Sequence, residues 1–211
     1  MAMISPRSFV VRKMIACAVI AVCAAALSGC TSYRTQMAVR SMVSDATIFP
    51  VLTVKAYIPS DRNTADVFLS DIPEARLIDL NDPLNDVAGN IVHLHIFLMP
   101  EAGQTPIDDS ACNITVRHAV LTGASTEKGP VAGIYAGGGF CLPASAPGDR
   151  VFDGSVRDAT MRLSRVGDGF VDRLGAARMS GSFAAPRNDQ LARAISQRLE
   201  SISRRMSEVA R

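Results

Sequence analysis

From residue 49 onward the sequence is a series of short apolar runs, and nearly every run is closed by Pro, Gly, Asn or Asp. These residues supply or fix backbone angles that strands do not adopt, so they mark turns between strands. Many short strands separated by turn residues are typical of an all-β sandwich or barrel. The sequence therefore predicts strands over residues 51–58, 66–70, 76–80, 91–99, 113–121, 131–141, 155–165 and 177–183.

The segment 91–99 has the clearest strand pattern in the chain. Large aliphatic residues occupy every second position, namely Val92, Leu94, Ile96 and Leu98. Because side chains alternate between the two faces of a strand, we expect these four to face the core. The other face begins with His93 and His95 and is half polar. An antiparallel sheet with one face partly open to water has this pattern.

The last part of the chain predicts an amphipathic helix over residues 188–211. Asn188 or Asp189 can cap it, because their side chains accept hydrogen bonds from free backbone N–H groups of the first turn. Apolar residues then recur at steps of three or four and form one narrow stripe. They are Leu191, Ile195, Leu199, Ile202, Met206 and Val209. The predicted fold is therefore mainly β, a two-layer β-sandwich or partly open barrel with one C-terminal amphipathic α-helix.

Two irregularities interrupt the predicted strands. The alternation within 155–165 shifts between Val156 and Ala159, which indicates a β-bulge. The run Gly137-Gly138-Gly139 lies inside the strand 131–141, where glycine marks a bulge, a bend or a close approach of two backbones. A phosphate-binding loop requires Gly-Lys-Ser or Gly-Lys-Thr before a helix, and this run has neither. A backbone-lined ligand groove is the alternative interpretation.

The N-terminus has a different character from the rest of the chain. Arg7, Arg12 and Lys13 precede an apolar stretch, 14–27, and residues 1–29 contain no Asp or Glu. The stretch is shorter than the roughly 20 apolar residues that span a bilayer. Basic residues, a short apolar run and small residues before a cleavage site are typical of a secretory signal peptide.

This signal ends in Leu27-Ser28-Gly29-Cys30, a tetrapeptide that resembles a bacterial lipobox. The resemblance covers the first 30 residues and implies that Cys30 is diacylated with palmitate-type chains, becomes the new N-terminus and is acylated there. Several acyl chains would hold the chain firmly to a membrane. Thr31 follows the cysteine, and the absence of Asp there implies the outer membrane, facing the periplasm. A non-lipidated signal or an uncleaved anchor is the alternative.

The predicted organisation follows from this signal. Residues 1–29 form the signal peptide, 30–48 a lipidated N-terminus and tether with a short helix near 35–43, and 49–211 a single domain. Without the three basic residues of the signal, the 22 Lys and Arg of the chain become 19 against 20 Asp and Glu. The net charge of −1 and the envelope location both argue against a nucleic-acid partner.

Two cysteines remain in the predicted domain, Cys112 and Cys141. An even pair in an exported protein favours a disulfide, because the compartment is oxidising. Two free buried thiols are the alternative.

Histidine provides the candidate metal ligands. His93 and His95 lie at i and i+2 of one strand, so both imidazoles point to the same side and can chelate Zn²⁺ or Cu²⁺. His118 is the third and last histidine, but it lies among Ile114, Val116 and Val120. The alternative is two half-exposed polar residues and one hydrogen-bonded core histidine.

Catalytic motifs are not apparent in the predicted domain. The chain has no Gly-x-Ser-x-Gly nucleophile elbow. We therefore expect a non-enzymatic envelope lipoprotein that binds an envelope protein or supports an assembly, with no cofactor besides the lipid on Cys30. The alternatives are a small-ligand or metal-binding domain centred on His93 and His95, and an envelope hydrolase.

Overall fold

The computed structural model describes residues 35–100 and 111–209, so Cys30 and the predicted signal peptide lie outside the described residues. Ten strands occur in this part of the chain: β1 (Gln36–Ser41), β2 (Thr47–Ile48), β3 (Val54–Pro59), β4 (Ala65–Ser70), β5 (Ala88–Ile96), β6 (Ile114–Thr126), β7 (Gly129–Pro143), β8 (Val151–Val166), β9 (Ala177–Pro186) and β10 (Ser207–Glu208). They form one antiparallel sheet in the order β2-β1-β9-β8-β7-β6-β5-β4-β3, with β10 paired to β8.

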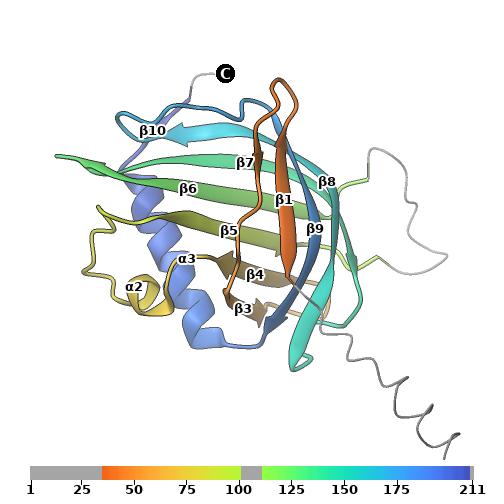
Figure 1. The fold of residues 1–211 in the computed structure, drawn as a ribbon. Helices are drawn as coiled ribbons and strands as arrows, with labels where there is room; N and C mark the ends of the chain where they lie inside the picture. The colour runs from red at the N-terminus through yellow and green to blue at the C-terminus, as the bar shows by residue number, and fades with distance from the viewer. Residues whose placement is uncertain (1–34, 101–110, 210–211) are drawn as a thin grey trace, which may run out of the picture. The chain divides into compact units, whose positions relative to one another are not determined.

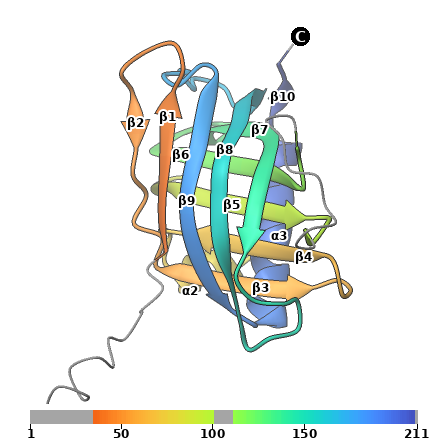
Figure 2. The ribbon, with the colours of Figure 1, turned by 90° about the vertical axis from the view of Figure 1, so that its right-hand side faces the viewer.

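The sheet curls so that β1, β8 and β9 cross over β3, β4 and β5 (Figures 1 and 2). The curl brings the end of β9 against β3, where the backbone N–H of Asn188 donates to the carbonyl of Tyr57 at 3.2 Å. Large side chains from both halves fill the space between them, including Tyr57, Tyr135, Phe152 and Phe183, all at most 1% exposed. The structure confirms the mainly β prediction, and the half-barrel corresponds to its partly open barrel.

Glycines of β7 allow the strands to approach closely where the sheet bends. A Cβ on Gly137 would lie 1.8 Å from the carbonyl oxygen of Thr160, and one on Gly139 would lie 2.4 Å from Cα of Ala159. The β8–β9 register shifts between Val156 and Ala159, as the sequence pattern predicted. The glycine run therefore serves close backbone contact between β7 and β8.

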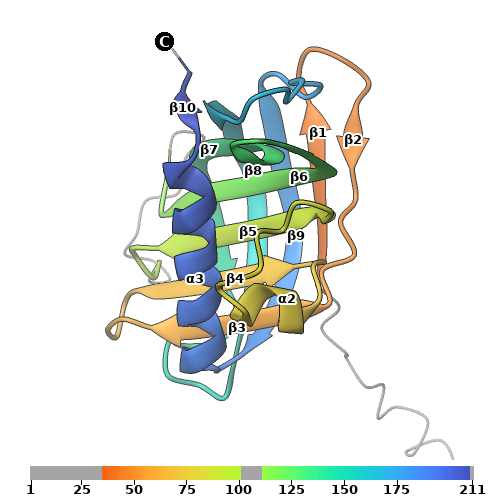
Figure 3. The same cartoon turned by 90° about the vertical axis from the view of Figure 1, so that its left-hand side faces the viewer.

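Helix α3 (Asp189–Arg204) covers the outer face of β3 to β7 (Figure 3). The Asn188 side chain caps it by accepting a hydrogen bond from the Leu191 N–H at 3.0 Å. Its apolar stripe packs on outward-facing side chains of the sheet and forms a second core. Members of that core include Phe68, Ile91, Ala119, Ile134, Leu191, Ile195, Leu199 and Ile202.

A short helix, α2 (Glu74–Ile78), lies beside α3. Arg198 of α3 is 2% exposed and donates hydrogen bonds to the carbonyl oxygens of Arg76, Asp79 and Asp82, so it ties α2 and the following loop to α3. None of the helices in the described part of the chain has the length and apolar character required to cross a membrane.

The predicted tether over 30–48 and its short helix are wrong for the described residues. Residues Gln36–Ser41 form β1, which lies between β2 and β9, and Met37 and Val39 are buried in the core. Met37 and Val39 are two positions apart, so both project to the same face of the strand. Pairing with β9 places Val39 opposite Met179. Pairing with a strand distant in sequence therefore overrides the weak helical spacing.

Three other segments also differ from the prediction. Residues predicted as a strand over 76–80 lie in or after α2, which starts directly after Pro73, a residue that tolerates a first helical turn. Strand β5 ends at Ile96, and Leu98 is exposed rather than in the core. The C-terminal helix ends at Arg204, because the chain then turns and Ser207 pairs with Val166 of β8.

Candidate functional site

The two histidines predicted as metal ligands lie together on the outer face of β5. Their neighbours Val92 and Leu94 point to the opposite face, into the interior of the curl. Strand β4 pairs alongside in a register that places His95 opposite Asp66. The sheet therefore adds an acidic side chain that the sequence pattern of 91–99 does not contain.

Both histidines share one oxygen of Asp66. His93 Nε2 lies 2.8 Å and His95 Nδ1 lies 2.9 Å from Asp66 Oδ1. Ser60 Oγ donates to the second oxygen, Oδ2, at 3.3 Å. The carboxylate accepts from three sides, which assigns the proton of each imidazole to the nitrogen that faces Asp66. Asp66, His93 and His95 are called the Asp66 cluster below.

The Asp66 cluster lies beside an aromatic ring and an ion pair. The Phe68 ring stacks on His93 with centroids 4.5 Å apart and an interplanar angle of 5°. Arg117 of β6 lies opposite His93 in the strand register and forms an ion pair with Glu200 of α3. The His93 side chain is 16% exposed and that of His95 is 39% exposed, so the cluster is fixed on one side and reaches solvent on the other.

His118 does not belong to this cluster. It is fully buried, and Nε2 lies 2.9 Å from Oδ1 of Asn90. Burial lowers the pKa of His118 to about 4, so this imidazole stays neutral near pH 7. The structure thus makes His118 a hydrogen-bonded core residue and leaves no three-histidine site.

The Asp66 cluster is held by hydrogen bonds rather than arranged around an open point. No set of three or more His, Cys, Asp or Glu side chains within residues 35–100 and 111–209 has the arrangement of a ready metal site. Comparison of the chain with protein-family models, with curated proteins and with solved structures gave no match. The chemistry of this site therefore has to be inferred from its own geometry.

The Asp66 carboxyl should make the stability of the fold depend on acid pH. Burial raises its pKa, but hydrogen bonds from His93 and His95 and their charge lower it more, so the net pKa lies below 3.8. Because the folded-state pKa is lower than the unfolded-state pKa, this stabilisation is complete above about pH 4 and is lost as pH falls through the folded-state value.

We expect Asp66→Asn to lower the free energy of unfolding by about 1–2 kcal/mol at pH 7 and by much less at pH 2. Urea unfolding followed by circular dichroism at both values measures the difference. Asp45→Asn, at an exposed position of the β1–β2 turn, is the control and should change little at either pH. A loss of the same size at both pH values would contradict stabilisation by the ionised Asp66 carboxylate.

The predicted Cys112–Cys141 disulfide is not formed in the structure, where both residues are free thiols. Cys141 is buried in the interior of the curl, whereas Cys112 is exposed. Cys112 Sγ lies 3.0 Å from the position of a Cβ on Gly138, three residues before Cys141. Positions an odd number of residues apart project to opposite faces of a strand, so the two sulfurs lie on opposite faces of β7.

The two thiols should therefore differ in reactivity. Burial raises the pKa of Cys141 to about 12, and the reactive form of a thiol is the thiolate. A maleimide reagent at pH 7.5 is expected to label Cys112 and to leave Cys141 unmodified until denaturant is added. Peptide mass spectrometry counts the labels. If neither residue is labelled until a reductant is present, the two cysteines form the disulfide and are not free thiols.

Proposed function

We propose that this chain is a lipid-anchored, non-enzymatic module of a bacterial envelope, and that its folded domain binds an envelope partner through its outer surface. The lipobox-like sequence that ends at Cys30 is the observation that carries this proposal. Folded structure begins as early as Gln36. Six residues span at most about 21 Å when extended, so the anchor would keep the domain close to the lipid surface.

A packed interior supports binding at the outer surface. Tyr57, Tyr135, Phe152 and Phe183 occupy the space inside the curl, and the core residues around them are almost entirely inaccessible to solvent. Small-molecule sites are usually concave cavities of several hundred Å³. A ligand of that size would have to displace these side chains, so the outer surface is the better candidate.

The mass of the protein extracted from native cells tests the anchor. We expect a chain that begins at Cys30 and carries two or three acyl groups, and we expect Cys30→Ala to leave the membrane fraction. Crosslinking in intact cells should give a discrete adduct that this variant lacks. A mass equal to the bare polypeptide, or a different N-terminal residue, would refute lipid anchoring.

Metal binding at the Asp66 cluster is a second candidate function, and the convergence of two imidazoles on one carboxylate oxygen favours it. With each imidazole proton moved to the other ring nitrogen, Zn²⁺ or Cu²⁺ would replace the shared hydrogen bonds, and His93 Nε2, His95 Nδ1 and Asp66 Oδ1 would hold the ion. Ser60, which donates to the second oxygen of Asp66, would orient the carboxylate as outer partners of metal ligands do.

Calorimetric titration of the full-length chain with zinc and with copper tests this candidate. Asp66→Asn should weaken binding at least about tenfold, because loss of even an indirect partner of a metal ligand weakens affinity by 10- to 100-fold. Asp45→Asn, which removes one exposed carboxylate elsewhere, should bind as the wild type does. Equal affinity in the wild type and Asp66→Asn would exclude a metal site at the cluster.

A further inference from the structure

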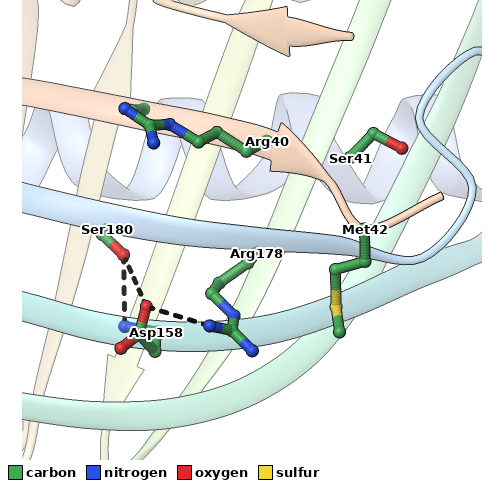
Figure 4. Close-up of a pocket in the computed structure, with 7 residues that line it drawn as sticks. Arg40, Ser41, Met42, Asp158, Arg178 and Ser180 are labelled. Atoms are coloured by element: carbon green, nitrogen blue, oxygen red, sulfur yellow. Dashed lines mark hydrogen bonds and ion pairs between the residues drawn. The ribbon is translucent and has the colours of Figure 1, made fainter. Parts of the chain in front are cut away.

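A second polar site lies on the outer face of the other half of the sheet, where β1, β9 and β8 run side by side (Figure 4). It is an open cavity of about 450 Å³. The polar and flexible side chains that line it include Arg40, Met42, Asp158, Arg178 and Ser180. None of these residues belongs to the Asp66 cluster.

Two arginines on neighbouring strands line this cavity (Figure 4). Arg40 of β1 is the direct register partner of Arg178 of β9. Like charges directly opposite on neighbouring strands destabilise a sheet. Arg178 has a distant acidic partner, with 3.7 Å between its Nη1 and Asp158 Oδ1. No carboxylate within the described ranges forms an ion pair with Arg40, so the arrangement leaves one net positive charge.

The backbone is also unusual at this position. Asp158 has φ of +47°, in the left-handed region that few residues other than glycine, asparagine and aspartate adopt. The residue lies within the β-bulge between Val156 and Ala159, and bulges redirect side chains. Its N–H donates to Ser180 Oγ at 3.2 Å, and Ser180 Oγ lies 3.3 Å from its carboxylate. Residues other than glycine in this backbone region cluster at functional sites.

We propose that this cavity binds a phosphate group between Arg40 and Arg178. A guanidinium presents a planar fork of donors that matches the oxygens of a phosphate, and two forks approaching from neighbouring strands would neutralise its charge. Bound phosphate would reduce the repulsion between the two arginines. It would thereby account for two like charges at directly opposite positions of the strand register.

Two sources can supply such a phosphate: a phospholipid headgroup or a phosphate free in solution. Arg40 lies ten residues after Cys30, so under the proposed lipid anchoring a headgroup would be within reach of β1. Only the lipid source depends on the proposed function. The recognition chemistry is the same for both, and the experiment separates them.

Protection of arginines from phenylglyoxal, read residue by residue by mass spectrometry, tests the site in the full-length chain. One arm adds inorganic phosphate to detergent-solubilised protein at constant ionic strength. The other arm places the protein in phosphatidylcholine vesicles with or without phosphatidylglycerol, free of phosphate. Exposed Arg62, in the β3–β4 turn, is the internal control.

We expect Arg40 and Arg178 to be protected while Arg62 is not. Protection by inorganic phosphate alone identifies a free anion as the ligand, and protection by phosphatidylglycerol identifies a lipid headgroup. Both results support the site. No protection in either arm, or equal protection of Arg62, overturns it. Loss of lipid anchoring would leave the phosphate arm unchanged, so the two proposals fail separately.

Two variants sharpen the test. Arg178→Gln should raise the phosphate concentration that half-protects Arg40 about tenfold, as loss of a charged hydrogen bond predicts. Asp158→Asn should lower that concentration, because it removes the negative charge while asparagine tolerates the positive φ. An unchanged half-protection concentration in both variants would contradict binding between the two arginines. If a variant does not fold, the wild-type comparison with Arg62 decides the question.

Discussion

Gly137→Ala is expected to cost at least about 3 kcal/mol of folding free energy, or to prevent folding. The added Cβ would lie 1.8 Å from the carbonyl oxygen of Thr160 and 2.7 Å from Cα of Met161. Both atoms belong to the backbone of β8, so relief requires the two strands to separate where the sheet bends. Overpacking against movable side chains already costs about 1–3 kcal/mol, and backbone atoms move less easily.

Gly138→Ala, one position further along the same strand, is the matched control. Its Cβ would approach Cys112 Sγ and the carbonyl oxygen of Ile114 at 3.0 Å each, contacts that shifts of a few tenths of an ångström relieve. We expect a loss below about 1.5 kcal/mol. Chemical unfolding followed by circular dichroism compares the two, and equal losses would mean that close contact with β8 does not explain the glycine run.

Phe152→Ala is expected to destabilise the fold by about 3–5 kcal/mol. Phe152 is fully buried and joins the two halves of the curl, with its ring centroid 5.4 Å from that of Tyr57 and 5.8 Å from that of Phe183. Truncation would leave a cavity between strands that cross each other, where the sheet cannot collapse without changing its curvature. Such a loss is a large fraction of the 5–15 kcal/mol typical of a domain.

Phe49→Ala removes the same side chain from an exposed position and should change stability by less than about 0.5 kcal/mol, since Phe49 is 61% exposed. The chain contains no tryptophan, so the unfolding curves are best followed by far-ultraviolet circular dichroism. If Phe152→Ala unfolds at the denaturant midpoint of the wild type, the aromatic cluster does not hold the two halves together.

The local pattern of apolar and polar residues was sufficient to predict the strands whose two faces differ most in polarity. Apolar runs closed by turn residues predicted β5 to β9, the shift in alternation predicted the bulge after Val156, and apolar steps of three or four behind a capping residue predicted the helix that begins at Asp189. Strand β1 was missed because it has only two core residues, Met37 and Val39, among polar neighbours. Its assignment depends on β9, which lies at the other end of the sequence and which no local window contains.

The candidate site could be predicted only in part for the same reason. The i and i+2 spacing identified His93 and His95 as residues on one face, but Asp66 joins them only through the register of β4 on β5. The opposed arginines Arg40 and Arg178 likewise meet through the register of β1 on β9. Register is set by turns and by packing of the whole sheet, so a single strand does not reveal its partners.

The pairing of β1 with β9 has a consequence for the order of events during synthesis. The Thr35 hydroxyl donates to the carbonyl of Ala184, 149 positions away in the chain. Strand β1 can pair with β2 as soon as both are made, but its other edge stays unpaired until β9 has been made. If the chain is exported as proposed, the edge of β1 that pairs with β9 stays open during most of the passage across the inner membrane, so closure of the sheet belongs to a late, slow stage of maturation in which holding factors would act.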